Sequence, residues 1–201
     1  MTIYDLKPAF QNLLRPICRL LANTGVTANQ VTVAALLFSL VVGGLFALNP
    51  TSAWAAYLVP IWLFVRMALN AIDGMLAREH NMKSALGGVL NEIGDVVSDT
   101  ALYIAFAFVP GLSPALIIAI VVLAIFTEMA GVVAIQIGAT RRYDGPMGKS
   151  DRAFVFGLLA LLLGLGIEVG AWMNAALGIV AALTAWTVIN RCRKALAELS
   201  A

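Results

Sequence analysis

The sequence predicts an all-α membrane protein with six transmembrane helices and an N-terminal amphipathic helix at the membrane surface. Of its 201 residues, 61% are hydrophobic and only 12% are charged, and the mean hydropathy is +0.92. A soluble domain of this length needs far more charged surface. The apolar residues fall in runs long enough to cross about 30 Å of hydrocarbon, and basic residues lie between alternate runs. We expect one membrane domain, at residues 27–190.

The first segment, residues 1–26, is expected to form a helix on the cytosolic membrane surface. Its apolar residues recur at spacings of three and four: Ile3, Leu6, Phe10, Leu13, Leu14, Ile17, Leu20 and Leu21. The basic residues Lys7, Arg15 and Arg19 lie between them. Such a pattern is typical of a helix that lies on an anionic membrane surface.

The predicted spans and the basic loops between them give the orientation. The spans are residues 27–48, 52–76, 86–109, 114–138, 153–167 and 171–189. Basic residues precede the first span, separate the second from the third and the fourth from the fifth, and follow the sixth, while the alternate loops have none. The positive-inside rule therefore places both termini in the cytosol. Residues 191–201 would be a cytosolic basic tail, and we interpret Arg191, Arg193 and Lys194 as positive-inside charge.

Polar residues on the second and third predicted helices form two stripes near the cytosolic end. Asn70, Asp73 and Ala77 share one face of the second helix, with Gly74 at its edge. On the third helix, the residues spaced by four are Gly87, Asn91, Asp95 and Asp99, and Glu92 begins a second stripe. Unpaired carboxylates in hydrocarbon are costly. Carboxylate and amide oxygens are ligands for a hard divalent cation, and the small residues leave room for an extended ligand beside the helix backbone.

These stretches, "NAIDGMLAR" and "GGVLNEIGD", resemble the signature of the CDP-alcohol phosphatidyltransferase family. That signature reads Asp, two residues, Asp-Gly, two residues, Ala-Arg, eight residues, Gly, three residues, Asp, three residues, Asp. The matching positions, with every spacing kept, are Asp73, Gly74, Ala77, Arg78, Gly87 and Asp95. Asn70 and Asn91 stand at the first and third Asp positions. "VTANQVT" is similar to the family's Pro-Asn-x-x-Thr, with Ala28 in place of the Pro.

The resemblance implies a reaction and a role for each matching residue. Mg²⁺ or Mn²⁺ would bind at Asp73, Asn70, Asn91 and Asp95, with Glu92 able to restore a carboxylate. The nucleotide of CDP-diacylglycerol would bind at Asn29, Thr32, Asp73, Gly74, Ala77, Arg78 and Gly87. Asp95 would deprotonate a polar alcohol, whose oxygen attacks the β-phosphate and releases CMP. The general logic is that of metal-assisted phosphoryl transfer with a general base.

The resemblance also implies the setting of this reaction. It would take place in a bacterial inner membrane, with the site facing the cytosol and the chain acting as a homodimer. We expect no nucleic-acid partner. The acceptor stays open among glycerol phosphate, inositol or its phosphate, an amino alcohol and another polyol.

The remaining charged residues have a functional and a structural interpretation. Arg141, Lys149 and Arg152 lie in "IGATRRYDGPMGKSDRA" and could form a pocket for an anionic group of the acceptor; equally, they could be positive-inside charge in contact with anionic lipid. Arg66 and Asp99 lie at matching depths, which predicts an ion pair with a structural role. Glu128 lies at a similar depth and could join them.

Two other functions compete with the transferase. The Asn residues at two Asp positions allow a pseudoenzyme that binds CDP-lipid and regulates lipid synthesis, although Asp73 and Asp95 favour activity. A small transporter could also use buried charges as an ion path. The sequence has no internal repeat and its acids gather near one membrane face, which counts against transport.

Overall fold

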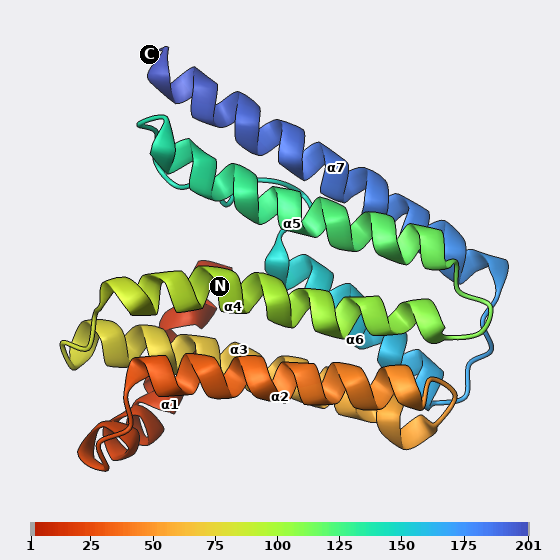
Figure 1. Ribbon diagram of the computed structural model, residues 1–201, viewed down its shortest axis with the longest axis horizontal. Helices are drawn as coiled ribbons and strands as arrows, with labels where there is room; N and C mark the ends of the chain where they lie inside the picture. Colours follow the sequence, from red (N-terminus) through yellow and green to blue (C-terminus); the bar gives the residue numbers. More distant parts are fainter. Residues whose placement is uncertain (1–2, 201) are drawn as a thin grey trace. The chain divides into compact units, whose positions relative to one another are not determined.

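The computed structural model describes residues 3–200, with side chains from residue 9 onward, and over this range it contains helices and no strand. In chain order the helices are α1 (Ile3–Asn23), α2 (Ala28–Leu48), α3 (Ala53–Glu79), α4 (Ala85–Ile104), a 3₁₀ turn η1 (Ala105–Phe108), α5 (Pro114–Gln136), α6 (Lys149–Gly164) and α7 (Ala171–Leu199). Figure 1 shows their order along the chain. The predicted all-helical class is confirmed.

Four of these helices are long and apolar enough to cross a membrane: α2, α3, α5 and α7. The other two helices at predicted spans are α4, which carries Glu92, Asp95 and Asp99, and α6, which has 16 residues. A helix of 16 residues is about 24 Å long, which is less than the hydrocarbon thickness. The chain is a membrane protein, and the count of six spans stays a prediction. Helix α7 runs about three turns past the predicted end of the last span. It therefore includes most of residues 191–201, for which the sequence predicts a cytosolic tail.

The chain divides into two compact units, and α2, α3 and α4 each contribute residues to both. The first unit comprises residues up to Val41 together with Ile61–Ser98, and the second comprises Val42–Pro60 together with residues from Asp99 onward.

The core of the first unit joins α1 to α2 and α3. Its buried residues are Leu14, Cys18, Ala28, Val31, Ile72, Met75 and Leu76. Arg15 of α1 makes an ion pair of 3.0 Å with Glu79 at the end of α3. Other apolar residues of α1, Leu13, Ile17 and Leu20, are exposed. The predicted α1 positions Ile3, Leu6 and Lys7 lie outside the described side chains.

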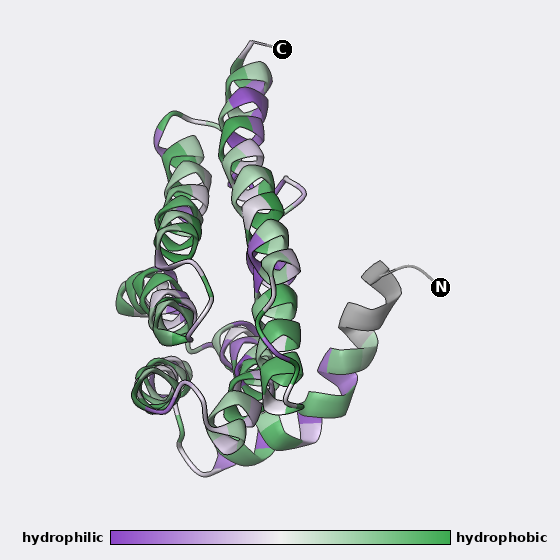
Figure 2. Cartoon of the chain, turned by 90° about the vertical axis from the view of Figure 1, so that its right-hand side faces the viewer, coloured by the Kyte–Doolittle hydropathy of each residue, from purple (hydrophilic) through white to green (hydrophobic). Residues whose placement is uncertain are grey.

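The second unit is held by close helix packing and an aromatic cluster. Helices α5 and α7 lie side by side. A Cβ atom on Gly43 of α2 would lie only 2.4 Å from the carbonyl oxygen of Ala101 in α4, so a glycine is required for this close approach. Phe156 of α6 stacks on Tyr103, with ring centroids 4.2 Å apart. The hydrophilic residues of α7 gather toward its C-terminal end (Figure 2).

Candidate nucleotide and acceptor sites

A cavity of about 350 Å³ opens in the first unit, and its lining includes the signature positions Asp73, Gly74, Ala77, Arg78, Gly87 and Asn91 but not Asn70 or Asp95. Its lining is formed by Ala28, Asn29, Thr32, Asp73, Gly74, Ala77, Arg78, Met82, Lys83, Ser84, Gly87, Gly88 and Asn91. All seven residues predicted to bind the nucleotide are among them. The volume lies at the lower end of the range typical of ligand pockets, about 300–1,000 Å³.

The first turn of α2 is fixed by a capping box that positions two lining residues. The Thr27 hydroxyl accepts from the Gln30 backbone N–H at 3.3 Å, and the Gln30 side chain accepts from the Thr27 N–H at 2.9 Å. This reciprocal pair satisfies N–H groups that a helix start leaves unpaired. Asn29 and Thr32 therefore project from a defined helix end. The Thr32 hydroxyl donates to Asp73 Oδ2 at 2.8 Å, which ties α2 to the signature helix α3.

Gly87 lets α2 approach the start of α4. A Cβ atom at this position would lie 2.6 Å from Asn29 Oδ1 and 3.0 Å from Ser84 Oγ. Ser84 also caps α4, because its hydroxyl accepts from the Gly87 N–H at 2.9 Å. A side chain at the signature glycine would therefore displace Asn29 or Ser84 at the cavity wall.

Asp95, the predicted general base, is held by two donors from α3. Arg66 Nη2 lies 3.1 Å from Asp95 Oδ1, and Asn70 Nδ2 donates to the same oxygen at 3.2 Å. Arg66 is only 3% exposed and also donates to the Asp95 carbonyl oxygen. The guanidinium therefore offsets the charge of the carboxylate and orients it. The predicted pair of Arg66 with Asp99 stays a prediction.

The residues predicted to bind the metal offer oxygen atoms, which suit a hard cation, but few of them are carboxylates. Within residues 3–200, no group of three or more Asp, Glu, His or Cys side chains could hold a metal. A cation would therefore depend on amide oxygens as well. Asp73 and Asn91 both line the cavity, Asn70 contacts Asp95, and Glu92 is half-buried on α4. Their carboxylate and amide oxygens are the kind of ligand that a hard divalent cation binds.

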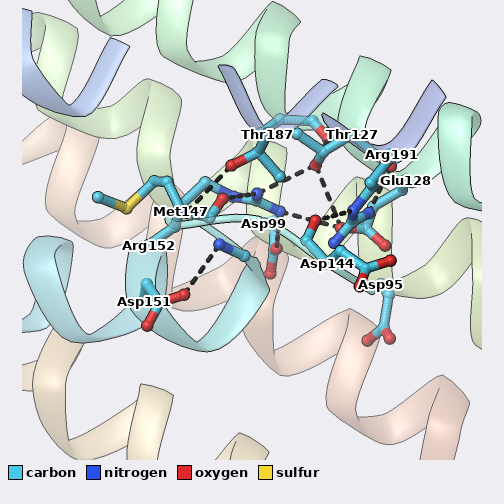
Figure 3. A network of polar contacts seen from close by, with 12 residues as sticks. Asp95, Asp99, Thr127, Glu128, Asp144, Met147, Asp151, Arg152, Thr187 and Arg191 are labelled. Atoms are coloured by element: carbon cyan, nitrogen blue, oxygen red, sulfur yellow. Dashed lines mark hydrogen bonds and ion pairs between the residues drawn. The ribbon is translucent and has the colours of Figure 1, made fainter. Parts of the chain in front are cut away.

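In the second unit, Glu128 of α5 lies among three arginines. Its carboxylate is 3.2 Å from Arg152, 3.5 Å from Arg191 and 3.6 Å from Arg141. Figure 3 shows Arg152 and Arg191 directed toward Glu128 and Thr127. Arg152 also lies 3.9 Å from Asp99, so Asp99 and Glu128 share one guanidinium. We call Glu128, Arg141, Arg152 and Arg191 the arginine cluster.

The loop between α5 and α6 is tied to α7. The Thr187 hydroxyl accepts from the Met147 N–H at 3.0 Å, and Lys194 donates to Asp144 at 2.7 Å. This hydrogen bond from Lys194 lowers the pKa of the Asp144 carboxyl. At Gly145, φ is +134° and a Cβ atom would lie 2.4 Å from Thr187, so only glycine fits there.

The three residues of the predicted anion pocket have different surroundings in the structure. Arg152 is completely buried and Arg141 contacts Glu128, while Lys149 begins α6, where Asp151 accepts from the Gly148 N–H at 2.9 Å. Arg191, for which the sequence predicts only positive-inside charge, is 2% exposed and contacts Glu128. A polar face at spacings of three and four on α7, formed by Thr184, Thr187, Arg191, Lys194 and Glu198, is the sequence signal that could have identified it.

Comparisons with known proteins show the family of the chain and its fold. Residues 25–189 match the family model for CDP-alcohol phosphatidyltransferases. The chain is 48% identical over 196 residues to the inner membrane protein YnbA of Escherichia coli, covering 98% of this chain and 97% of that protein. Its fold resembles the crystal structure of Mycobacterium tuberculosis phosphatidylinositol phosphate synthase with CDP-DAG bound, with a TM-score of 0.75, 18% identity and coverage of 90% and 92%. The structure of that synthase with manganese and citrate gives a TM-score of 0.73, 18% identity and coverage of 90% and 88%.

Proposed function

Because the chain belongs to the CDP-alcohol phosphatidyltransferase family, we propose that it transfers a phosphatidyl group from CDP-diacylglycerol to a polar alcohol and releases CMP. The single observation that carries this proposal is the cavity of the first unit, whose lining includes every residue that the signature assigns to the nucleotide. The bound CDP-DAG of the mycobacterial synthase, a protein of similar fold, supports the same donor.

The cavity residues would hold the cytidine and the pyrophosphate. Gly74 and Ala77 leave the backbone of α3 accessible, and Asn29 of α2 offers an amide to the same cavity. Arg78 also lines the cavity and would contact a phosphate oxygen. A divalent cation such as Mg²⁺ or Mn²⁺, when bound at Asp73, Asn91 and their neighbours, neutralises charge on the pyrophosphate. Phosphoryl transfer depends mainly on such positioning and charge neutralisation.

Asp95 would act as the general base. It takes the proton of the acceptor hydroxyl as the alcohol oxygen forms a bond to the β-phosphorus. The bond from that phosphorus to the bridging oxygen breaks, and its electron pair leaves with CMP. Arg66 and Asn70 would hold the carboxylate in position. Acceptor recognition falls, in this proposal, to the residues around the loop that carries Arg141, Lys149 and Arg152.

The membrane setting belongs to the same proposal. Helices α2 to α7 would all cross the inner membrane, with both termini and the cavity on the cytosolic side. The exposed residues Leu13, Ile17 and Leu20 of α1 would insert into the cytosolic leaflet. The chain would act as a homodimer, as the family resemblance implies.

CMP release by the purified protein tests the transferase. The assay uses CDP-diacylglycerol with Mg²⁺ or Mn²⁺ and a pool of polar alcohols and their phosphates. We expect acceptor-dependent release that falls by about 10²–10⁴-fold in Asp95→Asn, the usual contribution of a general base. Glu168→Gln makes the same chemical change at an exposed loop carboxylate and should keep full activity. Protein that binds CDP-diacylglycerol but releases no CMP with any acceptor would be the pseudoenzyme instead.

A further inference from the structure

We propose that Lys83, at a position that the signature leaves unspecified, binds the pyrophosphate of CDP-diacylglycerol together with Arg78. This inference rests on the proposed function, because it concerns the donor of that reaction. Both residues line the cavity of the first unit. The role of Lys83 follows from the structure of the loop between α3 and α4 and from the charges around the cavity.

The loop between α3 and α4 holds the backbone of Lys83 at the cavity (Figure 1). Asn81 has a φ of +58°, a left-handed conformation that asparagine tolerates better than most residues, and it turns the chain after the end of α3. Lys83 is followed by Ser84, whose hydroxyl accepts from the Gly87 N–H at 2.9 Å and from Asn29 Nδ2 at 3.3 Å. Lys83 therefore lies between a defined turn and a capped helix start.

Arg78 reaches the same cavity from the last turn of α3. A Cβ atom on Gly74 would lie 3.0 Å from Arg78 Nη2 and 3.3 Å from Nη1. The guanidinium is therefore folded back along α3, beside a glycine that lines the cavity. Arg78 and Lys83 thus bring two positive charges to one cavity.

Both cations are available to a ligand. Within the part of the chain whose side chains the structure describes, neither Arg78 nor Lys83 makes an ion pair or a side-chain hydrogen bond. Both residues are exposed. Glu79, which follows Arg78 in the chain, is bound by Arg15 instead, through hydrogen bonds of 3.0 and 3.3 Å. A phosphate would therefore not compete with an internal carboxylate for these donors.

The charge of the cavity lining also favours an anion. Of the described residues that form it, one is acidic, Asp73, and two are basic, Arg78 and Lys83. Asn91 belongs to the same lining and stands where the signature has an Asp, which removes a negative charge. A lysine binds phosphate as a point charge with three donors, and an arginine binds it through paired N–H groups. Lys83 would therefore add to the positive charge that a pyrophosphate needs, at a site with few acids to hold a cation.

Binding of CDP to the purified protein tests the role of Lys83. Calorimetry in detergent with Mg²⁺ gives the Kd of the wild type and of Lys83→Gln. We expect the Kd to rise by about tenfold or more in the variant, as is typical for the loss of a hydrogen bond from a charged group. Lys83→Met, which is also uncharged, should show the same loss, and Lys83→Arg should bind within about threefold of the wild type.

Arg193→Gln is the matched control, because it removes a positive charge from an exposed residue that does not line the cavity. Its Kd for CDP should equal that of the wild type. The thermal midpoint of Lys83→Gln without ligand should stay within about 2 °C of the wild type, since Lys83 is an exposed loop residue. An unchanged Kd in Lys83→Gln, an equal loss in Arg193→Gln, or no rescue by Lys83→Arg would overturn the proposal.

Binding and turnover separate failure of this inference from failure of the transferase. If the wild type binds CDP but releases no CMP from CDP-diacylglycerol with any acceptor, the transferase proposal fails, and the Kd values of the Lys83 variants still decide the role of Lys83. If CMP is released, the KM for CDP-diacylglycerol should rise in Lys83→Gln by the same factor as the Kd. An unchanged KM would leave the transferase standing and overturn the role of Lys83. A wild-type protein that does not bind CDP would overturn it as well.

Discussion

Asp73 in the first unit and Glu128 in the second are both acids on apolar helices, yet their surroundings differ. Asp73 accepts from the Thr32 hydroxyl and lies on a cavity wall beside Gly74 and Ala77. Glu128 contacts three arginines, two of them almost completely buried. Small neighbours leave space for a charged ligand, whereas long basic neighbours fill the space and offset the charge. A polar residue in an apolar helix therefore indicates a ligand site only when its neighbours are small enough to leave space for the ligand.

The Asp73→Asn variant should separate activity from stability in the first unit. We expect turnover to fall by about 10³-fold, because the carboxylate would help to hold the cation and the pyrophosphate. The thermal midpoint in detergent should stay within about 2 °C of the wild type, since the amide can still accept from Thr32. CMP release and the unfolding curve are measured on the same preparation. A large fall in the thermal midpoint would mean that Asp73 is mainly structural.

For Arg191 in the second unit, we expect substitution to lower stability. Arg191→Gln should lower the free energy of unfolding by about 3 kcal/mol, because it leaves the partly buried Glu128 with less compensating charge. Arg193 lies two residues further along α7 and is exposed. Arg193→Gln should therefore change the free energy of unfolding by less than about 0.5 kcal/mol. Thermal unfolding of the two variants in one detergent gives the comparison. Equal midpoints would show that the cluster does not hold the second unit together.

Gly87→Ala tests whether close packing shapes the cavity. The added Cβ would lie 2.6 Å from Asn29 Oδ1, so Asn29 or α4 must shift. We expect the KM for CDP-diacylglycerol to rise by about tenfold, in line with displacement of a binding group by a fraction of an ångström. Gly44→Ala, in α2, meets no atom within 4 Å and should leave KM unchanged. An unaffected KM in Gly87→Ala would place nucleotide binding elsewhere.

The residues that line the cavity of the first unit could be predicted because their signals are local. Helical periodicity put Asn70, Asp73 and Ala77 on one face, and the fixed spacing of the signature identified the residues that line the cavity. Residue spacing along two adjacent helices is therefore enough to predict most of the candidate nucleotide site.

The partners within the arginine cluster could not be predicted from spacing along one helix, because their contacts join distant parts of the chain. Glu128 on α5, Arg152 on α6 and Arg191 on α7 come together only through tertiary packing. The basic residues also agree with the positive-inside rule. This rule accounts for a basic residue near the end of a membrane span without requiring an acidic partner for it. Burial, which separates Arg191 from Arg193, depends on the face of α7 that packs and on the loop that covers it.

The contact between Asp144 and Lys194 gives the smallest expected effect, and it depends on pH. The hydrogen bond from Lys194 lowers the pKa of Asp144 below its usual value of 3.8. The folded chain therefore binds this proton more weakly than the unfolded chain, so the contribution to stability is present above about pH 4 and is lost as the pH falls through the folded pKa. Since the Lys194 side chain is 52% exposed, solvent screening keeps this contribution below about 1 kcal/mol. The thermal midpoints of the wild type and Asp144→Asn should differ by a constant amount from about pH 5 to 8 and converge below pH 4. A difference that persists at pH 3 would assign the effect of Asp144 to its backbone contacts with α7 instead.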